Sequence, residues 1–250
     1  MDFQEAIRKI EERGDFNRFA EVKPIFTERL ERLREGDHTE RGLCYYYLLI
    51  SYLKAHLVHE TQEAIEFYEA MDDAFTKQEE VYRKDKKKFA WGEMRDYFRL
   101  MNRCYGSLEI LYVKHDFRIR RLASHRRKMQ FKKDSFFFNS EYWHWFEYKV
   151  LEITSDYGTS LTRWSITTIG FVVFMGVVYG VVDLFTDPAM RIVQDSNLFD
   201  YIYFSLITLT AVGFGDVFPL AIIAKMLVML EAFLGLVMLG IFIGLINKKL

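Results

Sequence analysis

The chain has 250 residues, half of them hydrophobic and 28% charged, and its 34 Lys and Arg side chains nearly balance 35 Asp and Glu side chains. This balance excludes a protein that binds nucleic acid through its overall charge, and we expect no nucleic-acid partner. Only three prolines and 14 glycines favour long helices over a turn-rich β-protein. The two cysteines, Cys44 and Cys104, are too few for a disulfide framework and are predicted to be buried.

Charged residues are distributed unevenly along the chain. Residues 1–160 hold 29 basic and 29 acidic side chains, whereas residues 161–250 hold only five and six. The sequence therefore predicts a soluble, highly charged part that is followed by a part within a membrane.

The soluble part shows helical periodicity and almost no strand pattern. Helices are predicted over residues 2–13, 16–35, 41–58, 61–88, 91–129 and 141–156, and Ser140 is the predicted N-cap of the last one. The pairing of RGLCYYYLLISYLKAHL with TQEAIEFYEAMDDAF resembles the helical hairpins of tetratricopeptide-like proteins. The predicted fold class is therefore all-α, and residues 1–140 form a cytoplasmic helical domain that is either tetratricopeptide-like or an irregular bundle.

A basic stretch lies late in this part. From Lys114 to Lys133 there are nine Lys and Arg side chains and a single acidic one, Asp116. We interpret the stretch either as a site for anionic lipid or as a helix face that pairs with residues 1–80, which hold 11 basic and 19 acidic side chains.

Clusters that could carry chemistry are few. His56 and His59 with Glu60 and Glu63 give a His-x-x-His helix face, but without further ligands at suitable spacing no metal site is expected. The sequence has no phosphate-binding glycine loop and no Gly-x-Ser-x-Gly motif, so we expect neither enzyme activity nor a cofactor.

The aromatic segment 141–163 connects the two parts and contains EYWHWFEYKV. We predict that it forms a linker helix, which either lies in the plane of the membrane interface or packs against neighbouring subunits.

Two long apolar stretches follow. Trp164 to Val182 are 19 residues without a charge, enough to cross a bilayer, and predict an outer helix over 164–185. Met226 to Ile246 contain one charge, Glu231, and predict an inner helix over 219–247. Arg163 before the first stretch and the Lys248–Lys249 pair after the second predict that both termini are cytoplasmic.

The segment between these helices is also apolar but too short to span a membrane. Asp200 and Asp216 enclose 15 uncharged residues that end in Gly-x-Gly. Because non-helical backbone at membrane depth must be buried in protein or line a watery path, we predict a short helix over 198–209 that is followed by an extended return over 210–216.

This return segment resembles the selectivity filter of potassium channels. The residues that carry the resemblance are Thr210, Ala211, Val212, Gly213, Phe214, Gly215 and Asp216. The turn Tyr157-Gly158-Thr159-Ser160 is also similar to the Tyr-Gly turn before the pore module of some bacterial channels.

The resemblance implies a homotetrameric potassium channel of the two-helix type, with residues 164–250 as its pore domain. The backbone carbonyls of Ala211, Val212, Gly213 and Phe214 would bind K⁺, the permeant ion. Gly235 takes the place of the hinge glycine in the inner helix. Leu236, Leu239, Ile243 and Asn247 would line the cavity and the inner gate.

Several positions depart from the family pattern. Ala211 replaces the first filter threonine, which removes four hydroxyl ligands per tetramer and keeps a weakly selective cation pore as an alternative. Phe214 replaces the commoner tyrosine, and Ile207 stands where some bacterial channels have a glutamate behind the filter. Tyr203 is predicted to offer its hydroxyl to Asp216 instead.

Glu231 lies inside the inner helix, where an ionisable residue is costly. We interpret it as a brace that is hydrogen-bonded to Ser205 or Thr208 of the short helix, with an ion-binding role as the alternative. Asp183, Asp187, Asp195 and Asp200 lie between the outer and short helices, where they either attract cations or form an ordinary solvated loop.

The predicted function is a potassium-selective channel in the plasma membrane, or in the inner membrane if the protein is bacterial. The N-terminal domain would assemble the tetramer or couple an unknown ligand or protein to the gate. A membrane-anchored helical scaffold is the alternative from another class.

Overall fold

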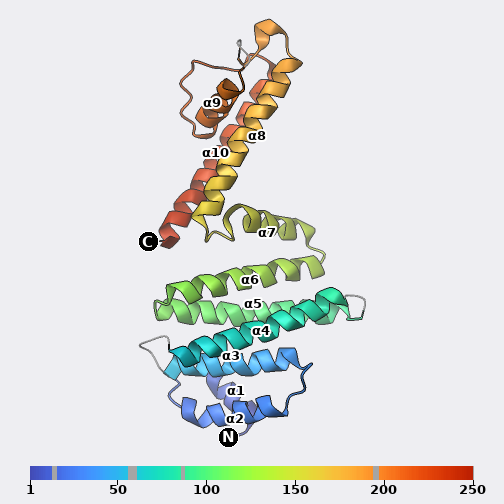
Figure 1. Cartoon of the computed structure of the whole chain (residues 1–250), viewed down its shortest axis with the longest axis vertical. Coiled ribbons are helices and arrows are strands. Elements are labelled where there is room, and N and C mark those ends of the chain that lie inside the picture. The colour runs from blue at the N-terminus through green and yellow to red at the C-terminus, as the bar shows by residue number, and fades with distance from the viewer. Residues whose placement is uncertain (13–15, 56–60, 86–87, 194–196, 250) are drawn as a thin grey trace. The chain divides into compact units, whose positions relative to one another are not determined.

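The computed structural model describes residues 1–12, 16–55, 61–85, 88–193 and 197–249. Within these ranges the chain forms ten α-helices, one short 3-10 helix and no strand, which confirms the all-α class (Figure 1). His56, His59 and Glu60 lie outside the described residues. The chain divides into two compact units, Met1–Glu147 and Tyr148–Leu250, so the boundary falls inside the predicted linker segment.

The first unit is built from helical hairpins. Its helices are α1 (Phe3–Glu11), α2 (Phe19–Arg32), α3 (His38–Ala55), α4 (Gln62–Lys84), α5 (Trp91–Lys114) and α6 (Arg118–Phe138). Helix α3 pairs with α4 and α5 pairs with α6, while α1 and α2 pack against α3 (Figure 1). The α3–α4 hairpin alone runs from His38 to Lys84, which is longer than the 34-residue tetratricopeptide unit.

Aromatic side chains form much of the core of this unit. Phe26, Phe75, Tyr105, Tyr112 and Phe131 are all less than 2% exposed and come from four helices, α2, α4, α5 and α6. Their apolar area accounts for the tight contact between successive hairpins, because each buried aromatic removes a large surface from water.

The single helix predicted over residues 91–129 is wrong, because the chain reverses at Asp116. Helix α5 ends at Lys114, and Asp116 adopts a left-handed conformation at φ 59°. The Phe117 N–H donates to the Tyr112 carbonyl (3.0 Å) and the Asp116 N–H donates to the Val113 carbonyl (3.3 Å), while the Phe117 and Tyr112 rings lie 6.2 Å apart. This is a Schellman cap in which aspartate takes the place of the usual glycine.

The prediction that Ser140 caps the next helix is also wrong. Ser140 has φ 61° and its N–H donates to the Phe137 carbonyl, so it ends α6 in a second Schellman cap. Helix α7 (Tyr142–Ser155) begins two residues later.

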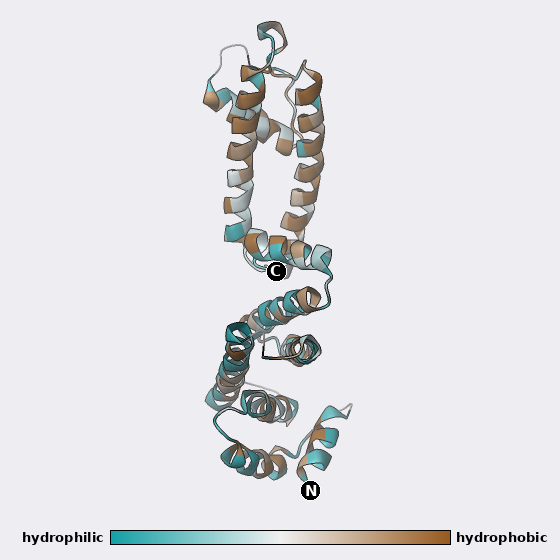
Figure 2. Cartoon of the chain, turned by 90° about the vertical axis from the view of Figure 1, so that its right-hand side faces the viewer, coloured by the Kyte–Doolittle hydropathy of each residue, from teal (hydrophilic) through white to brown (hydrophobic). Residues whose placement is uncertain are grey.

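The second unit contains the two apolar helices that the sequence predicts. Helices α8 (Leu161–Leu184) and α10 (Ile222–Lys249) are long and apolar enough to cross a membrane. Between them lie the 3-10 helix η1 (Pro188–Met190) and the short helix α9 (Leu198–Leu209), whose bounds match the prediction. Figure 2 shows hydrophobic residues along α8, α9 and α10, whereas the helices of the first unit are mixed.

A left-handed turn connects α7 to α8. Asp156, Tyr157 and Gly158 have φ values of 51°, 57° and 72°. The Tyr157 N–H donates to the Leu151 carbonyl (3.0 Å), and the Ser160 N–H donates to the Ser155 carbonyl (2.9 Å). Helix α8 then starts three residues earlier than predicted, because the Ser160 hydroxyl accepts a hydrogen bond from the Arg163 N–H and caps its first turn.

Candidate functional site

The end of α9 directs the chain into the candidate filter. The Asn197 side chain caps the start of α9 by accepting from the Phe199 N–H (3.1 Å). At its other end the Ile207 carbonyl accepts from the N–H groups of both Val212 (3.0 Å) and Gly213 (3.2 Å). The helix therefore ends in a tight turn that is fixed by backbone hydrogen bonds.

The loop after this turn has an alternating backbone. Ala211, Gly213 and Gly215 have φ values of 56°, 50° and 81°, while the residues between them do not have positive φ. Such alternation turns successive peptide groups toward the same side, whereas a regular strand points them to opposite sides. All six residues from 211 to 216 are exposed on the single chain. The loop can thus present a row of backbone carbonyls to a ligand that lies outside this chain.

Tyr203 of α9 holds the end of this loop. Its hydroxyl donates to a carboxylate oxygen of Asp216 at 2.7 Å, which is the hydrogen bond that the sequence predicts. Ile207, at the position of the glutamate in some bacterial channels, is buried in the apolar cluster behind α9. The Tyr203 hydroxyl therefore tethers the loop to α9 without a second carboxylate.

Glu231 of α10 binds two hydroxyls behind the loop. Its two carboxylate oxygens accept hydrogen bonds from Ser205 of α9 and from Tyr179 of α8, each at 2.5 Å, and the residue is fully buried. Of the two predicted partners, Ser205 makes the bond, and Tyr179 is a partner that the sequence analysis missed. The contact connects all three helices, because each contributes one residue.

A second buried carboxylate, that of Asp183, lies at the C-terminal end of α8, one turn after Tyr179. Asp183 is 2% exposed and accepts from the N–H groups of Ile192 and Val193 and from the Tyr201 hydroxyl at 2.8 to 3.1 Å. The sequence predicted that this group of aspartates would either attract cations or form a solvated loop. For Asp183 both predictions are wrong, because its carboxylate is buried and hydrogen-bonded within the chain. Asp187 is exposed and Asp200 is half-buried, while Asp195 lies outside the described residues.

Helix α10 contacts the end of α9 at Gly235, where an added Cβ atom would stand 2.1 Å from the Leu209 carbonyl oxygen. The four predicted cavity and gate residues recur every three or four positions along α10 and are all exposed on the single chain: Leu236, Leu239, Ile243 and Asn247. The structure thus gives Gly235 a packing requirement in addition to the predicted hinge role.

The outer and inner helices also meet near their other ends. The Trp164 ring of α8 stacks on the Phe242 ring of α10, with centroids 4.9 Å apart and planes 29° apart. Sequence analysis could not pair these residues, because they are far apart in the chain and each belongs to an unbroken apolar stretch. Phe242 lies next to Ile243, so the stack holds the part of α10 that carries the predicted gate.

Two apolar spanning helices that enclose a short helix and an exposed carbonyl loop define the pore module of an ion channel. Residues 166–250 match the family model Ion_trans_2, described as an ion channel. The match covers residues 166–250 and supports an ion-channel function and a membrane location for this part of the chain. No curated protein and no solved structure matches the chain.

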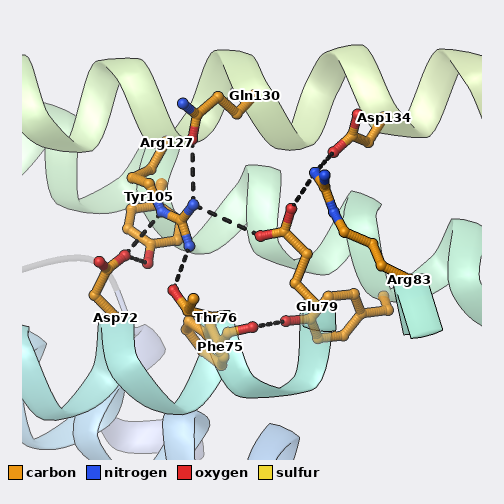
Figure 3. A network of polar contacts seen from close by, with 10 residues as sticks. Asp72, Phe75, Thr76, Glu79, Arg83, Tyr105, Arg127, Gln130 and Asp134 are labelled. Carbon is orange, nitrogen blue, oxygen red and sulfur yellow. Dashed lines mark hydrogen bonds and ion pairs between the residues drawn. The ribbon is translucent and has the colours of Figure 1, made fainter. Parts of the chain in front are cut away.

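Arg120, Arg127 and Lys128 of the basic stretch form ion pairs with acidic residues of α4 and α5. Arg127 of α6 binds Asp72 (2.8 Å), Thr76 (3.0 Å) and Glu79 (3.6 Å) of α4, and it also contacts Tyr105 of α5 (Figure 3). The neighbouring Arg120 lies 3.6 Å from Glu69. At these positions the structure favours the interpretation that the stretch pairs with the acidic first half of the chain.

Two further side chains of α6, those of His125 and Lys128, bind a glutamate of α5. Glu109 accepts from His125 (2.8 Å) and Lys128 (2.9 Å), and these two partners lower the pKa of its carboxyl to about 2.

The cysteines are buried as predicted, and burial raises the pKa of both the Cys44 and the Cys104 thiols to about 12. These thiols are thus protonated at neutral pH and chemically inert.

Proposed function

We propose that the chain is a homotetrameric, potassium-selective channel. The observation that carries the proposal is the exposed loop 211–216, whose φ values alternate in sign and whose sequence resembles the potassium filter. Four copies of this loop around an axis would surround an ion with carbonyls from Ala211, Val212, Gly213 and Phe214, which would replace its hydration shell.

The remaining parts of the chain have roles in this proposal. Helix α9 carries the filter, and Tyr203, Asp216 and Glu231 hold it in place. The exposed face of α10 lines the cavity and closes it near Ile243 and Asn247. Residues 1–140 lie in the cytoplasm and assemble the tetramer or couple a ligand, protein or anionic lipid to the gate, and the channel resides in the plasma membrane. K⁺ is the permeant ion, and no cofactor is required.

The test is the reversal potential of the purified chain in a planar bilayer, with K⁺ on one side and Na⁺ on the other. Reversal near the potassium equilibrium potential is the expected result. Reversal near zero with a robust current would contradict potassium selectivity. Cross-linking of the same sample must give a product of four copies, since a smaller assembly cannot close the carbonyl ring.

A weakly selective cation pore is the second candidate, and Ala211 is the observation that favours it. Its methyl group offers no oxygen, so the innermost ion site has only backbone carbonyls. The variant Ala211→Thr separates the two candidates. If the weakly selective pore is correct, the threonine hydroxyl shifts the reversal potential toward that of potassium, whereas a selective wild-type filter leaves little room for such a shift.

A further inference from the structure

Helix α7 exposes a continuous apolar face. Its exposed apolar side chains include Tyr142, Trp143, Phe146, Val150 and Ile153, which are between 40% and 70% exposed. At about 100° of rotation per residue, these five positions fall within an arc of about 100° on the helix surface. None of the charged residues of α7 falls within this arc, so the helix is amphipathic.

The rest of the helix surface carries all the charged side chains of α7, which are paired with one another, and also Trp145, Tyr148 and Leu151. His144 bonds to Glu147 (3.0 Å), and Lys149 donates to Glu152 (2.9 Å). These side chains satisfy each other along the helix, while the apolar face is left to be covered by something outside the chain.

The course of the chain after α7 indicates what covers this face. Only residues 156–160 separate α7 from α8, and the Thr167 hydroxyl of α8 lies 3.4 Å from the Thr154 carbonyl of α7. The last turn of α7 therefore lies against the beginning of the helix that crosses the membrane. The start of a spanning helix lies at the boundary between head groups and acyl chains, where aromatic residues are enriched. An apolar face rich in Trp, Tyr and Phe next to it therefore fits this boundary.

We propose that α7 lies in the plane of the membrane interface, with its apolar face turned into the acyl region and its polar face toward water. The partner is thus the lipid bilayer surface at which α8 begins. This proposal does not depend on ion selectivity, because it rests on the exposed face and on the connection to a spanning helix.

The experiment compares spin labels on opposite faces of α7 in the full chain, reconstituted in phosphatidylcholine–phosphatidylglycerol vesicles. Phe146→Cys places the label on the apolar face, and the matched control His144→Cys places it on the polar face two residues earlier. Cys44 and Cys104 are buried, and the labelled wild-type chain gives their background. Accessibility is measured to oxygen, which concentrates in the bilayer, and to a water-soluble nickel complex.

The expected result is a several-fold higher ratio of oxygen to nickel accessibility at position 146 than at position 144. Nickel accessibility at 146 equal to that at 144 would place the face in water and overturn the proposal. Low accessibility of position 146 to both reagents would place the face against protein, such as a second copy, and would also overturn it. Val150→Cys and Ile153→Cys must behave as Phe146→Cys does, so the outcome does not depend on one variant.

Discussion

Tyr203 and Asp216 are 13 residues apart in sequence, yet a hydrogen bond joins them across the loop that we propose to be the filter. Replacing Tyr203 by phenylalanine removes only the hydroxyl and leaves the ring in place. The loss of a hydrogen bond to a charged acceptor is expected to weaken the attachment of the loop to α9. We therefore expect current through Tyr203→Phe to decline several-fold faster during a sustained voltage step in a planar bilayer.

Tyr142→Phe is the matched control for this prediction. It removes a hydroxyl from an exposed tyrosine of α7, far from the loop in sequence, and should leave the decline of the current unchanged. Equal decline in wild type and Tyr203→Phe would show that the hydrogen bond does not support the filter.

Glu231 offers a second test at the scale of single residues, because both of its oxygens are occupied by hydroxyls. Glu231→Leu leaves the Ser205 and Tyr179 hydroxyls buried without their acceptor, at about 1–3 kcal/mol each. We expect a clear fall in the thermal unfolding midpoint of the purified protein. The triple variant that also carries Ser205→Ala and Tyr179→Phe should recover part of it, since no polar group then lacks a partner. A triple variant no more stable than Glu231→Leu would contradict this account.

Among the elements, the two long apolar helices and the short helix between them were the most predictable from sequence. The uncharged run that begins at Trp164, the single charge at Glu231 and the motif from Thr210 to Asp216 are strong local signals, because a bilayer tolerates few polar groups. The filter motif and the short helix before it lie in one continuous segment, so no long-range contact was needed to find them.

Features that depend on a rare backbone state or on a distant partner were missed. Asp116 ends α5 in a conformation that glycine normally adopts, so nothing in the sequence marked the reversal. Asp183 reads as a loop aspartate until the fold brings the Ile192 and Val193 N–H groups to it. Trp164 and Phe242 pair only because α8 and α10 lie side by side.

Gly235 allows a prediction about how α10 packs on α9. An alanine there places its Cβ 2.1 Å from the Leu209 carbonyl oxygen, far inside van der Waals contact, so one helix must move. We expect Gly235→Ala to lower the stability of the pore module by about 3 kcal/mol or more, as overpacking against rigid backbone does. The change is measured as a shift in the thermal unfolding midpoint together with a loss of current.

Gly240 supplies the control on the same helix, because an added Cβ there meets nothing within 4 Å. Gly240→Ala should be neutral or stabilise the helix by up to about 1 kcal/mol through helix propensity. If Gly235→Ala and Gly240→Ala behave alike, the close approach of α10 to Leu209 is not what requires glycine at position 235.

For the molecule as a whole, the division into two units implies that each has its own stability. Each unit buries a separate apolar cluster, centred on residues such as Phe131 in the first and Tyr179 in the second. A substitution that destabilises one core should therefore leave the stability of the other unit largely unchanged, because the effects of distant substitutions are usually additive.

Arg127 tests this independence. Arg127→Ala leaves the carboxylates of Asp72 and Glu79 without their shared cation, and breaking such a half-buried network is expected to destabilise the first unit by about 3 kcal/mol. Arg95→Ala, which removes an exposed pairing with its neighbour Asp96, should cost less than about 1 kcal/mol. Calorimetry should show a lower unfolding temperature for the first unit in Arg127→Ala alone, while the reversal potential in a bilayer stays at its wild-type value. A shifted reversal potential would mean that the packing of the first unit reaches the filter, and the two cores would then have to be treated as one cooperative structure.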